Sequence, residues 1–493
     1  MQSWPQVMKG VDVMNFKLPG YVRKVMSVLE QEGFEAYVVG GAVRDLLLGR
    51  LPDDYDVVTN ARPDEIKLLA QKHQLSLVSN LGQNFGVVML LVDKNVVEVA
   101  SYRNETYGSD AHKPEEVWYC DTLEEDLGRR DFTINAMAVN LAGTLVDKYG
   151  GQEDLRNKLL RTVGNADKRF EEDALRMFRA CRFVAQLNFA YDEKIGKAIE
   201  HSLERVQGLS LERIQIELNK LLVGEAASRG MELLVSSGLA AQSCRYREQG
   251  QTYGIALLPE LEPLRGLKQN PEYHQYDVWE HTLVALSHSD RSLDVSWGIL
   301  LHDIAKGMEG IRGTNDKGQP TDHGHEARGA GIAENILSRM RFPKELVARV
   351  GWLVRNHMKF GANSDAPDNV TWRWLRKCAR SGEFRENKVM AEAFKQLTAL
   401  CIADTAATTA TKQELISAQM YGNRLVTMAY HMPVHTSDLK LSGEDLFQEG
   451  LRPEQLGKVL PLLLQRVQDG AIRNTYEALL QAAVAWRERQ NNL

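Results

Sequence analysis

The sequence predicts an α+β protein in which a mixed sheet with helices precedes a long, nearly all-helical region. Over about the first 150 residues, short apolar runs alternate with helical patterns, which is typical of a sheet covered by helices. From about residue 152 onward, apolar side chains recur at the helical period and strand patterns almost vanish. A chain of 493 residues is too long for one core. We therefore expect four domains, over residues 1–150, 151–265, 266–425 and 426–493.

The first 150 residues contain an ordered series of predicted elements. Pro19 favours the start of a helix that ends near Gly33. After it we expect a strand at 34–39, a short helix at 43–49, a strand at 55–59, a helix at 63–73 and a hairpin of strands at 86–92 and 96–102. Farther on, we expect amphipathic helices at 172–189, 211–223, 278–290 and 330–340, a loop at 306–326, and helix ends at Gly450 and Gly470.

Composition excludes several classes of protein. A formal charge of −6 argues against non-specific coating of nucleic acid, although a local basic groove remains compatible with it. The five cysteines are scattered and form no CxxC pair, so neither a disulfide framework nor a zinc ribbon is indicated, and a reducing cytoplasm is expected. The first ten residues contain no signal-peptide core, and no apolar run approaches the roughly 18 residues that span a membrane. We expect no membrane contact, and the sequence identifies no protein partner.

The stretch 38–59 combines Gly40 and Gly41 with two aspartates, Asp54 and Asp56, in a strand pattern. Residues two apart in a strand face the same side, so the two carboxylates would repel each other unless a cation or a proton lies between them. Magnesium suits such a pair, because it accepts carboxylate, water and phosphate oxygens. A backbone without side chains at the two glycines would let amide groups approach a triphosphate. The alternative is a glycine turn followed by an acidic surface loop. Glu98 on a neighbouring strand is either a third acidic group or a partner of Arg103.

Four sequence segments, in order, resemble one enzyme family. They are GGAVRDLLLGRLPDDYDVVT (40–59), EEDLGRRDFTINAMA (124–138), GGQEDLRNKLLRTV (150–163) and RFEEDALRMFRACRF (169–183). They resemble the class II CCA-adding tRNA nucleotidyltransferase and bacterial poly(A) polymerase family. The resemblance implies a polymerase-β-like nucleotidyltransferase head over residues 1–150, in which Asp54 and Asp56 hold catalytic Mg²⁺. An RNA 3′-hydroxyl would attack the α-phosphate and release pyrophosphate.

The same resemblance assigns further residues to substrate binding. Arg44 and Asp45 would contact phosphates and stabilise the turn. Arginine has a forked, permanently charged group that suits phosphate, and the motif RRDFTIN contributes Arg129, Arg130, Asp131 and Asn135. A solvated basic turn is the alternative for this arginine pair.

The predicted helix 172–189 places Arg176, Arg179 and Arg182 on one arc, with Asp173 at its border. An adjacent acceptor and donor could meet the Watson–Crick edge of a base. The resemblance implies a neck and body over residues 151–265. In similar enzymes the EDxxR motif, which lies in this helix here, selects CTP and ATP without a nucleic-acid template. A surface i,i+3 salt bridge is the alternative.

A second set of polar residues lies past residue 270. Imidazole and carboxylate groups are ligands for divalent metals, and the set consists of His281, His302, Asp303, His325, His357 and Asp404. The ordered series resembles the HD phosphohydrolase superfamily and implies an HD domain over 266–425 with an unidentified divalent metal. Its substrates would be phosphomonoesters or 2′,3′-cyclic phosphates at RNA ends. A helical scaffold that retains its ligands without activity is the alternative.

These observations lead to one functional hypothesis and several rivals. The hypothesis is addition of CCA to the 3′ end of tRNA from CTP and ATP. A poly(A) polymerase or an A-only or CC-only enzyme would use the same active site. Rivals of other classes are an HD phosphohydrolase with an inert nucleotidyltransferase domain and a non-catalytic RNA-binding module. The tail over 426–493 would clamp the tRNA elbow or pack on the HD region, and residues 104–122 would be a loop that acts as a hinge or lid.

Overall fold

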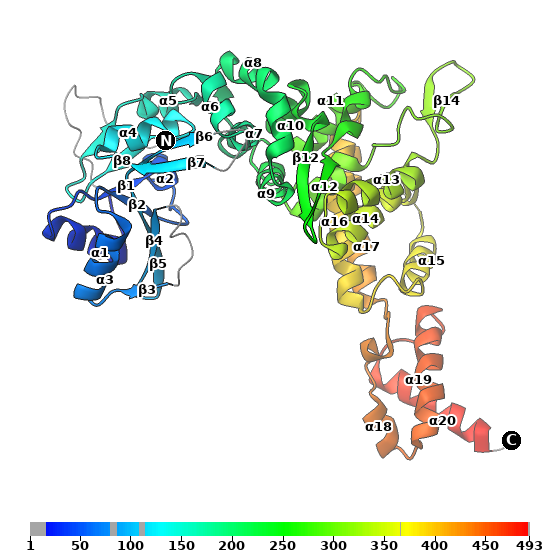
Figure 1. Cartoon of the computed structure of the whole chain (residues 1–493). Helices are drawn as coiled ribbons and strands as arrows, with labels where there is room; N and C mark the ends of the chain where they lie inside the picture. Colours follow the sequence, from blue (N-terminus) through cyan, green and yellow to red (C-terminus); the bar gives the residue numbers. More distant parts are fainter. Residues whose placement is uncertain (1–15, 79–85, 108–113, 365, 492–493) are drawn as a thin grey trace. The chain divides into compact units, whose positions relative to one another are not determined.

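The computed structural model describes residues 16–78, 86–107, 114–364 and 366–491 (Figure 1). The chain divides into two compact units, one up to Pro259 and one from Glu260 onward, and each unit is described by itself. A mixed sheet with helices comes first and helices dominate thereafter, which confirms the predicted α+β class. In the part of the chain that the structure describes, no helix has the length and apolar character needed to cross a membrane.

A seven-stranded sheet forms the centre of the first unit. Its order is β3-β4-β5-β2-β1-β8-β9, in which β2 and β5 run parallel and every other neighbouring pair is antiparallel. The strands are β1 (Tyr37–Val39), β2 (Asp56–Thr59), β3 (Ser76–Leu77), β4 (Val87–Val92), β5 (Asn95–Ser101), β8 (Met137–Val139) and β9 (Leu145–Asp147). The predicted hairpin of β4 and β5 is confirmed, with Asp93 and Lys94 at positive φ in its turn.

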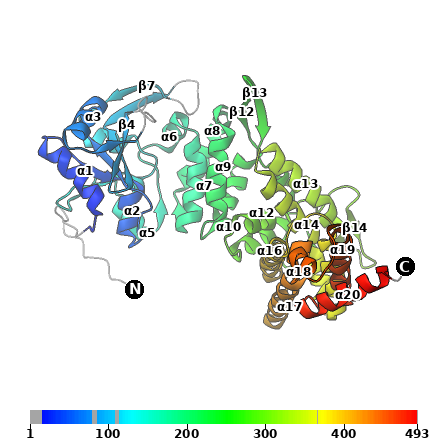
Figure 2. The same cartoon turned by 90° about the horizontal axis from the view of Figure 1, so that it is seen from below.

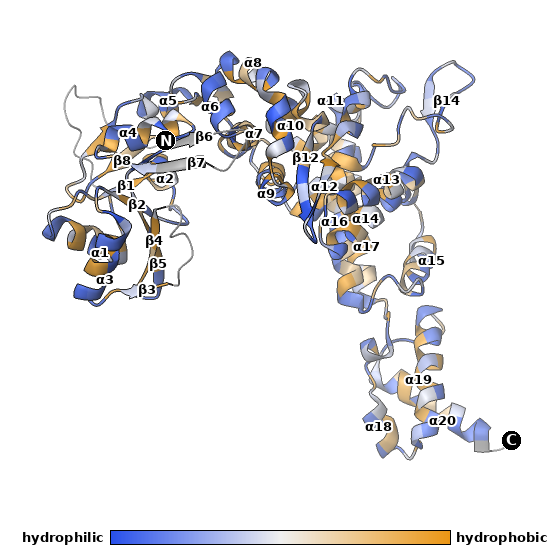
Figure 3. Ribbon diagram, in the orientation of Figure 1, coloured by the Kyte–Doolittle hydropathy of each residue, from blue (hydrophilic) through white to orange (hydrophobic). Residues whose placement is uncertain are grey.

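Helices cover this sheet and join its strands. Helix α1 (Gly20–Gln31) begins after Pro19, and it lies beside α3 (Pro63–Lys72) against the sheet (Figures 1 and 2). The buried residues Val22, Val25, Met26 and Leu29 follow the helical period and form the face of α1 that packs inward. Apolar residues along β4 and β5 stand out in Figure 3, as expected for strands that contribute to a core. The short helix α2 (Gly41–Leu47) connects β1 to β2.

The predicted loop at 104–122 is wrong in its main part. Strands β6 (Arg103–Tyr107) and β7 (Pro114–Tyr119) pair antiparallel across this stretch, and residues 108–113 lie outside the described residues. The two strands pair with each other rather than with the large sheet, so no buried apolar run marked them in the sequence.

The rest of the first unit is mainly helical. Its elements are α4 (Leu123–Gly128), η2 (Thr133–Asn135), α5 (Gly151–Asn157), α6 (Ala166–Glu172), α7 (Leu175–Leu187), α8 (Glu193–Ser202), η3 (Leu203–Gly208), α9 (Leu211–Leu222), α10 (Ala227–Ser236) and η4 (Leu239–Ala241). Two small β pairs interrupt the helices, namely β10 (Leu159–Leu160) with β11 (Ala190–Tyr191) and β12 (Ser243–Glu248) with β13 (Gln251–Ala256). The prediction of an almost purely helical region therefore missed these short pairs.

The second unit is a stack of helices that ends in a small tail. Its elements are η5 (Pro259–Leu264), α11 (Val278–Ser287), α12 (Leu293–Leu301), α13 (His325–Arg339), α14 (Lys344–Asn363), α15 (Asp368–Ala379), α16 (Asn387–Ala406), α17 (Lys412–His431), η6 (Thr436–Asp438), α18 (Gly443–Gln448), α19 (Pro453–Gln468) and α20 (Tyr476–Asn491). The predicted loop 306–326 contains a hairpin of β14 (Arg312–Thr314) and β15 (Pro320–Asp322). Asp322 stabilises it, because its carboxylate accepts hydrogen bonds from the backbone of Gly307 and from Arg312.

The tail has its own apolar core, and hydrogen bonds and ion pairs connect it to α15. Gly450 and Gly470 follow α18 and α19 at positive φ, which confirms the predicted helix ends. Trp372 donates to the carbonyl of Gln468, and Arg376 and Arg380 each lie 2.9 Å from Asp469. The tail thus contacts the helical region that precedes it, as one of the two predictions for 426–493 proposed.

Close packing between α7 and α10 gives a first test of the fold. A Cβ added at Gly230 would lie 2.5 Å from the carbonyl oxygen of Cys181 and 2.8 Å from Ala185 Cβ, so Gly230→Ala should destabilise the first unit by about 1–3 kcal/mol. The matched control is Gly196→Ala on α8, where the nearest atom is 3.9 Å away and better helix propensity should stabilise by up to about 1 kcal/mol. Differential scanning calorimetry of both variants measures the difference, and a neutral Gly230→Ala would contradict the packing.

Candidate active site and metal centre

Three carboxylates meet at the edge where β2 begins. Asp56 is the first residue of β2, and Glu98 on the parallel strand β5 lies directly opposite it. Asp54 precedes the strand, so of the two aspartates only Asp56 lies within it. The predicted alternation still holds, because Tyr55 is buried between the exposed Asp54 and the half-buried Asp56. The position of Glu98 favours its interpretation as a third acidic group.

This arrangement leaves negative charge uncompensated at Asp56. Burial and the carboxylates of Glu98 and Asp54 together raise the pKa of Asp56 to about 6, although Arg130 opposes the shift. The raised pKa means that the ionised form is less favourable in the folded protein than in water, and a nearby cation would offset this cost. The residues present therefore fit a divalent metal with oxygen ligands.

Arg130, which follows α4, lies beside the turn before α2. Gly40 has φ of +71°, and a Cβ at this position would lie 3.1 Å from Arg130 Nη1. Glycine therefore provides both the left-handed backbone and the room for the guanidinium. Arg130 forms an ion pair with Asp126 at 3.1 Å, and Asp126 also accepts a hydrogen bond from Arg129 at 2.8 Å. Burial opposes ionisation of Asp126, but Arg130 and Arg129 outweigh it and lower its pKa. The sequence reasoning missed Asp126, although its spacing of three and four residues from the arginines was a usable signal.

A chain of hydrogen bonds links the remaining predicted residues of RRDFTIN to α2 and α7. Arg44 donates two hydrogen bonds to the carboxylate of Asp45, at 2.9 and 3.0 Å, and one to Asn135 at 2.9 Å. Asn135 donates to Asp131, which also accepts from Arg179 at 2.7 Å. Although burial alone would raise the pKa of Asp131, Arg179 lowers it to about 2. These residues thus form one network.

The predicted helix over 172–189 is interrupted at its start. Helix α6 ends at Glu172, and Asp173 adopts an extended backbone and accepts a hydrogen bond from the backbone of Leu175, next to the start of α7. An aspartate competes well for free backbone N–H groups at such a position, which explains the break. The predicted pair of Asp173 and Arg176 on one helix face is therefore wrong, as is the alternative i,i+3 salt bridge between them.

The arginines of α7 have other partners. Arg176 donates to Glu172 at 2.8 Å and to the carbonyl oxygen of Arg129 at 2.7 Å. Arg182 pairs with Glu217 of α9 at 3.1 Å, and both side chains are buried. Asp173 lies 3.9 Å from Arg213. Sequence reasoning missed Glu217 and Arg213, because both come from a helix that meets α7 only in the folded chain.

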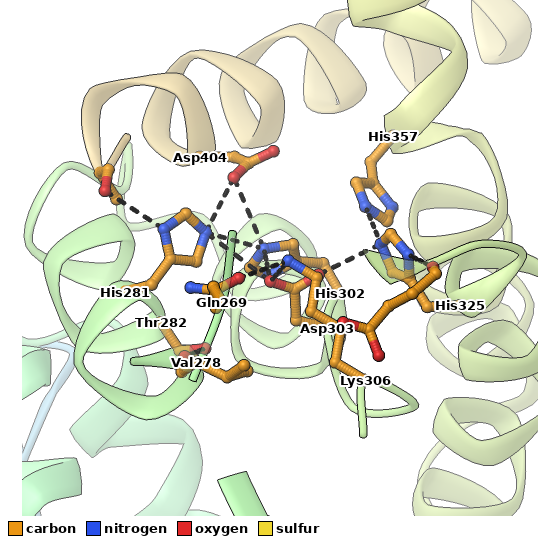
Figure 4. A network of polar contacts seen from close by, with 12 residues as sticks. Gln269, Val278, His281, Thr282, His302, Asp303, Lys306, His325, His357 and Asp404 are labelled. Atoms are coloured by element: carbon orange, nitrogen blue, oxygen red, sulfur yellow. Dashed lines mark hydrogen bonds and ion pairs between the residues drawn. The ribbon is translucent and has the colours of Figure 1, made fainter. Parts of the chain in front are cut away.

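All six predicted metal ligands of the second unit gather in one place (Figure 4). They come from α11 (His281), the turn after α12 (His302 and Asp303), α13 (His325), α14 (His357) and α16 (Asp404). Two groups of three have ligand atoms within 4.8 Å of one another, namely His281, His302 and Asp404, and Asp303, His325 and His357. Asp303 lies between the groups, 3.2 Å from His302 and 3.2 Å from His325.

The four histidines share one orientation. Each Nδ1 lies 2.7 to 3.2 Å from a backbone carbonyl oxygen. The carbonyl groups belong to Ala407, Ile299, Asp322 and Val354, in the order of the histidines along the chain. With Nδ1 as the donor, the Nε2 lone pair of each ring points into the cluster, as in metal sites. The donor set of imidazole nitrogens and carboxylate oxygens fits a divalent transition metal.

The electrostatics of this centre call for a cation. Burial alone would lower the pKa of His302, but Asp303 and Asp404 outweigh it and raise the pKa to about 10. Burial and the neighbouring His302 lower the pKa of His357 to about 3. Lys306 lies 2.7 Å from both Asp303 and Gln269. Sequence reasoning missed Lys306 and also His274, whose ring lies 5.0 Å from that of His281.

The charge at Asp56 predicts a stability change that depends on pH. Because its folded pKa is raised, the folded state holds the proton more tightly, and stability falls as pH rises from about 4 through 6. In EDTA at pH 7.5, Asp56→Asn should therefore stabilise the first unit by up to about 3 kcal/mol, and the gain should vanish near pH 4. Calorimetry of Asp56→Asn against the exposed control Asp53→Asn measures this effect; equal curves for both would contradict it.

Family models match three parts of the chain. "Poly A polymerase head domain" matches residues 36–161, and "Probable RNA and SrmB- binding site of polymerase A" matches 188–244. "HD domain" matches residues 272–404, which include all six residues of the metal centre.

Similar proteins extend this finding. A CCA-adding enzyme of Geobacillus thermodenitrificans is 42% identical over 227 residues, which are 46% of this chain and 55% of that enzyme. The chain thus spans about half the length of the first curated relatives that it matches. A CCA-adding enzyme of Levilactobacillus brevis is 31% identical over 463 residues, 93% of this chain and 96% of that enzyme.

Solved structures give the same picture. The Bacillus stearothermophilus CCA-adding enzyme in complex with CTP has a TM-score of 0.61 and 26% identity, and the match covers 96% of this chain and 98% of that one. The Thermotoga maritima CCA-adding enzyme complexed with tRNA has a TM-score of 0.52 at 19% identity, over 94% of each chain, and so supports the fold alone. With a curated relative aligned over nearly its whole length, the chain belongs to the family of CCA-adding enzymes.

Proposed function

We propose that this chain adds C, C and A to the 3′ end of tRNA from CTP and ATP, with release of pyrophosphate. The observation that carries the proposal is the carboxylate edge of Asp54, Asp56 and Glu98 beside the Gly40 turn and Arg130. Family membership supports it, as does the CTP named with the Bacillus stearothermophilus structure.

The chemistry follows from these residues. Asp54 and Asp56 would hold Mg²⁺, which when bound supplies charge that activates the 3′-hydroxyl and stabilises the leaving pyrophosphate. Arg130 favours the ionised form of Asp56 and lies beside the Gly40 turn, where phosphate oxygens would be received. Arg44, which donates two hydrogen bonds to Asp45, would contact phosphates and stabilise the turn around Gly40 and Gly41.

Base selection is assigned to Asp173, Arg176, Arg179 and Arg182. Asp173 and Arg176 each already interact with other residues of this chain. Both side chains would have to give up such a contact to form a hydrogen bond with a base. We assign residues 1–150 to the catalytic head, 151–265 to the neck and body, 266–425 to the HD domain and 426–493 to the tail, which would contact tRNA. The five free, buried cysteines support a cytoplasmic location.

Nucleotide incorporation tests the proposal. With tRNA that lacks its terminus, CTP and ATP should extend the product by CCA, and Asp54→Ala or Asp56→Ala should lower the rate by at least about 1,000-fold. Asp53→Ala, an exposed neighbour, is the matched control and should retain activity. Electrophoresis of the products distinguishes the rivals: a poly(A) ladder, A alone or CC alone would contradict full CCA addition.

We further propose that the HD centre is a metal-dependent phosphohydrolase for phosphomonoesters or 2′,3′-cyclic phosphates at RNA ends. Support comes from the convergence of six ligands whose histidines are all oriented by backbone carbonyls. Asp404 is 25% exposed while the other five ligands are almost fully buried, so a substrate would enter from the side of Asp404.

Metal analysis tests the HD centre separately from the head. Protein loaded with nickel or manganese should retain the metal after dialysis, and His302→Ala should weaken binding by at least about 100-fold. Asp54→Ala should keep this metal and should still hydrolyse 2′,3′-cyclic AMP. Equal metal content in wild type and His302→Ala, measured by mass spectrometry, would contradict a metal centre, and retained metal without hydrolysis would contradict the activity.

A further inference from the structure

The ring of Phe183 lies among three guanidinium groups. Arg182 Cζ is 4.2 Å from the ring centroid, Arg44 Cζ is 5.3 Å away and Arg179 Cζ is 5.4 Å away. The ring is 3% exposed, so these contacts are largely shielded from water. Two of the arginines come from α7, which also carries Phe183, and the third comes from α2 beside the Gly40 turn.

Three like charges around one ring repel each other and need compensation. Each guanidinium is paired with a carboxylate: Arg44 with Asp45, Arg179 with Asp131 and Arg182 with Glu217. Those carboxylates lie on different segments, namely α2, the segment before η2 and α9. The negative face of an aromatic ring attracts cations, and the ring of Phe183 is the group that all three arginines share.

The ring also contacts the segment between α4 and β8. Phe132 packs edge-on against Phe183 with ring centroids 5.6 Å apart and an interplanar angle of 80°. Phe132 lies next to Asp131, which accepts from Arg179, and close to Asn135, which accepts from Arg44. The ring of Phe183 therefore contacts α2 through Arg44 and the segment before η2 through Phe132.

We propose that Phe183 is a positioning residue of the nucleotide site, which holds Arg44, Arg179 and Arg182 in the arrangement that receives the nucleoside triphosphate. This assignment rests on the proposed function, because only then are the three arginines nucleotide ligands. Phe183 itself makes no contact with the reacting groups. It acts through the guanidiniums and should set the affinity for CTP and ATP, and it should leave the chemistry at Asp54 and Asp56 nearly unchanged.

Fluorination of the ring tests this role without a change of fold. Replacement of Phe183 by 4-fluoro-, 3,5-difluoro- and 3,4,5-trifluorophenylalanine withdraws electron density from the face and nearly keeps the shape. The dissociation constant of CTP should rise step by step along this series, to about tenfold for the trifluoro residue. The KM for CTP and ATP should rise in parallel, whereas kcat at saturating nucleotide should change by less than about twofold.

The matched control is the same fluorinated series at Phe178. This residue is also fully buried on α7, and in the described part of the chain no guanidinium faces its ring. The Phe178 series should leave CTP affinity unchanged, and calorimetry should give equal melting temperatures for both series. A constant CTP affinity along the Phe183 series, or the same loss along the Phe178 series, would overturn the proposal.

Failure of the proposed function has a different signature. In that case the unmodified protein would bind CTP, with the graded loss at Phe183, but would not extend tRNA. Phe183→Leu and Phe178→Leu add a cruder comparison of the same kind. Both substitutions remove a buried ring and should lower the melting temperature, but Phe183→Leu alone should raise the dissociation constant of CTP. An unmodified protein that binds no CTP would overturn both proposals.

Discussion

Parallel pairing of β2 with β5 places Asp56 directly opposite Glu98, and Arg130 opposes the negative charge that this register creates. Arg130 approaches from the Gly40 turn, where any side chain at residue 40 would crowd it. Asp126, with no exposed surface, holds Arg130 in place from the other side. The positive charge is thus fixed near Asp56 and does not cancel it, so the edge remains ready for a further cation.

The second centre balances its charges in another way. Asp303 and Asp404 are drawn close to four imidazoles whose outer nitrogens are all committed to the backbone. The carboxylates favour a proton on His302 while burial and His302 disfavour one on His357, so neighbouring rings prefer opposite charge states. A divalent cation removes this conflict, because it replaces the proton and accepts lone pairs from both kinds of ligand.

Local periodicity predicted much of this arrangement, and contacts between distant segments explain the errors. The alternation of Asp54, Tyr55 and Asp56 was readable because a strand has a period of two. The metal ligands were identified from their ordered series along the chain, although His302 and Asp303 lie in the turn after α12. The break at Asp173 was hidden, since a capping aspartate leaves the apolar pattern on both sides intact. Glu217 and Phe132 were not identifiable, because their partners on α7 are about 35 and 50 residues away in the chain.

The arginines of α7 differ in how much protein contact each must give up before it meets a ligand. Arg176 is 8% exposed and donates to Glu172 and to two backbone carbonyls, so a base can reach it only in exchange for one of these partners. Arg179 is 32% exposed, and its contact with Asp131 uses Nε and Nη2, which leaves Nη1 for a further acceptor. Under the proposed function, Arg176 would exchange a hydrogen bond within the protein for one to a base, so this contact would add little net affinity. It would still depend strongly on geometry, because a poorly placed base would leave a buried donor unpaired. Arg179 adds a ligand contact without losing one. Selection between bases would therefore depend mainly on Arg176 and affinity mainly on Arg179, one helical turn apart.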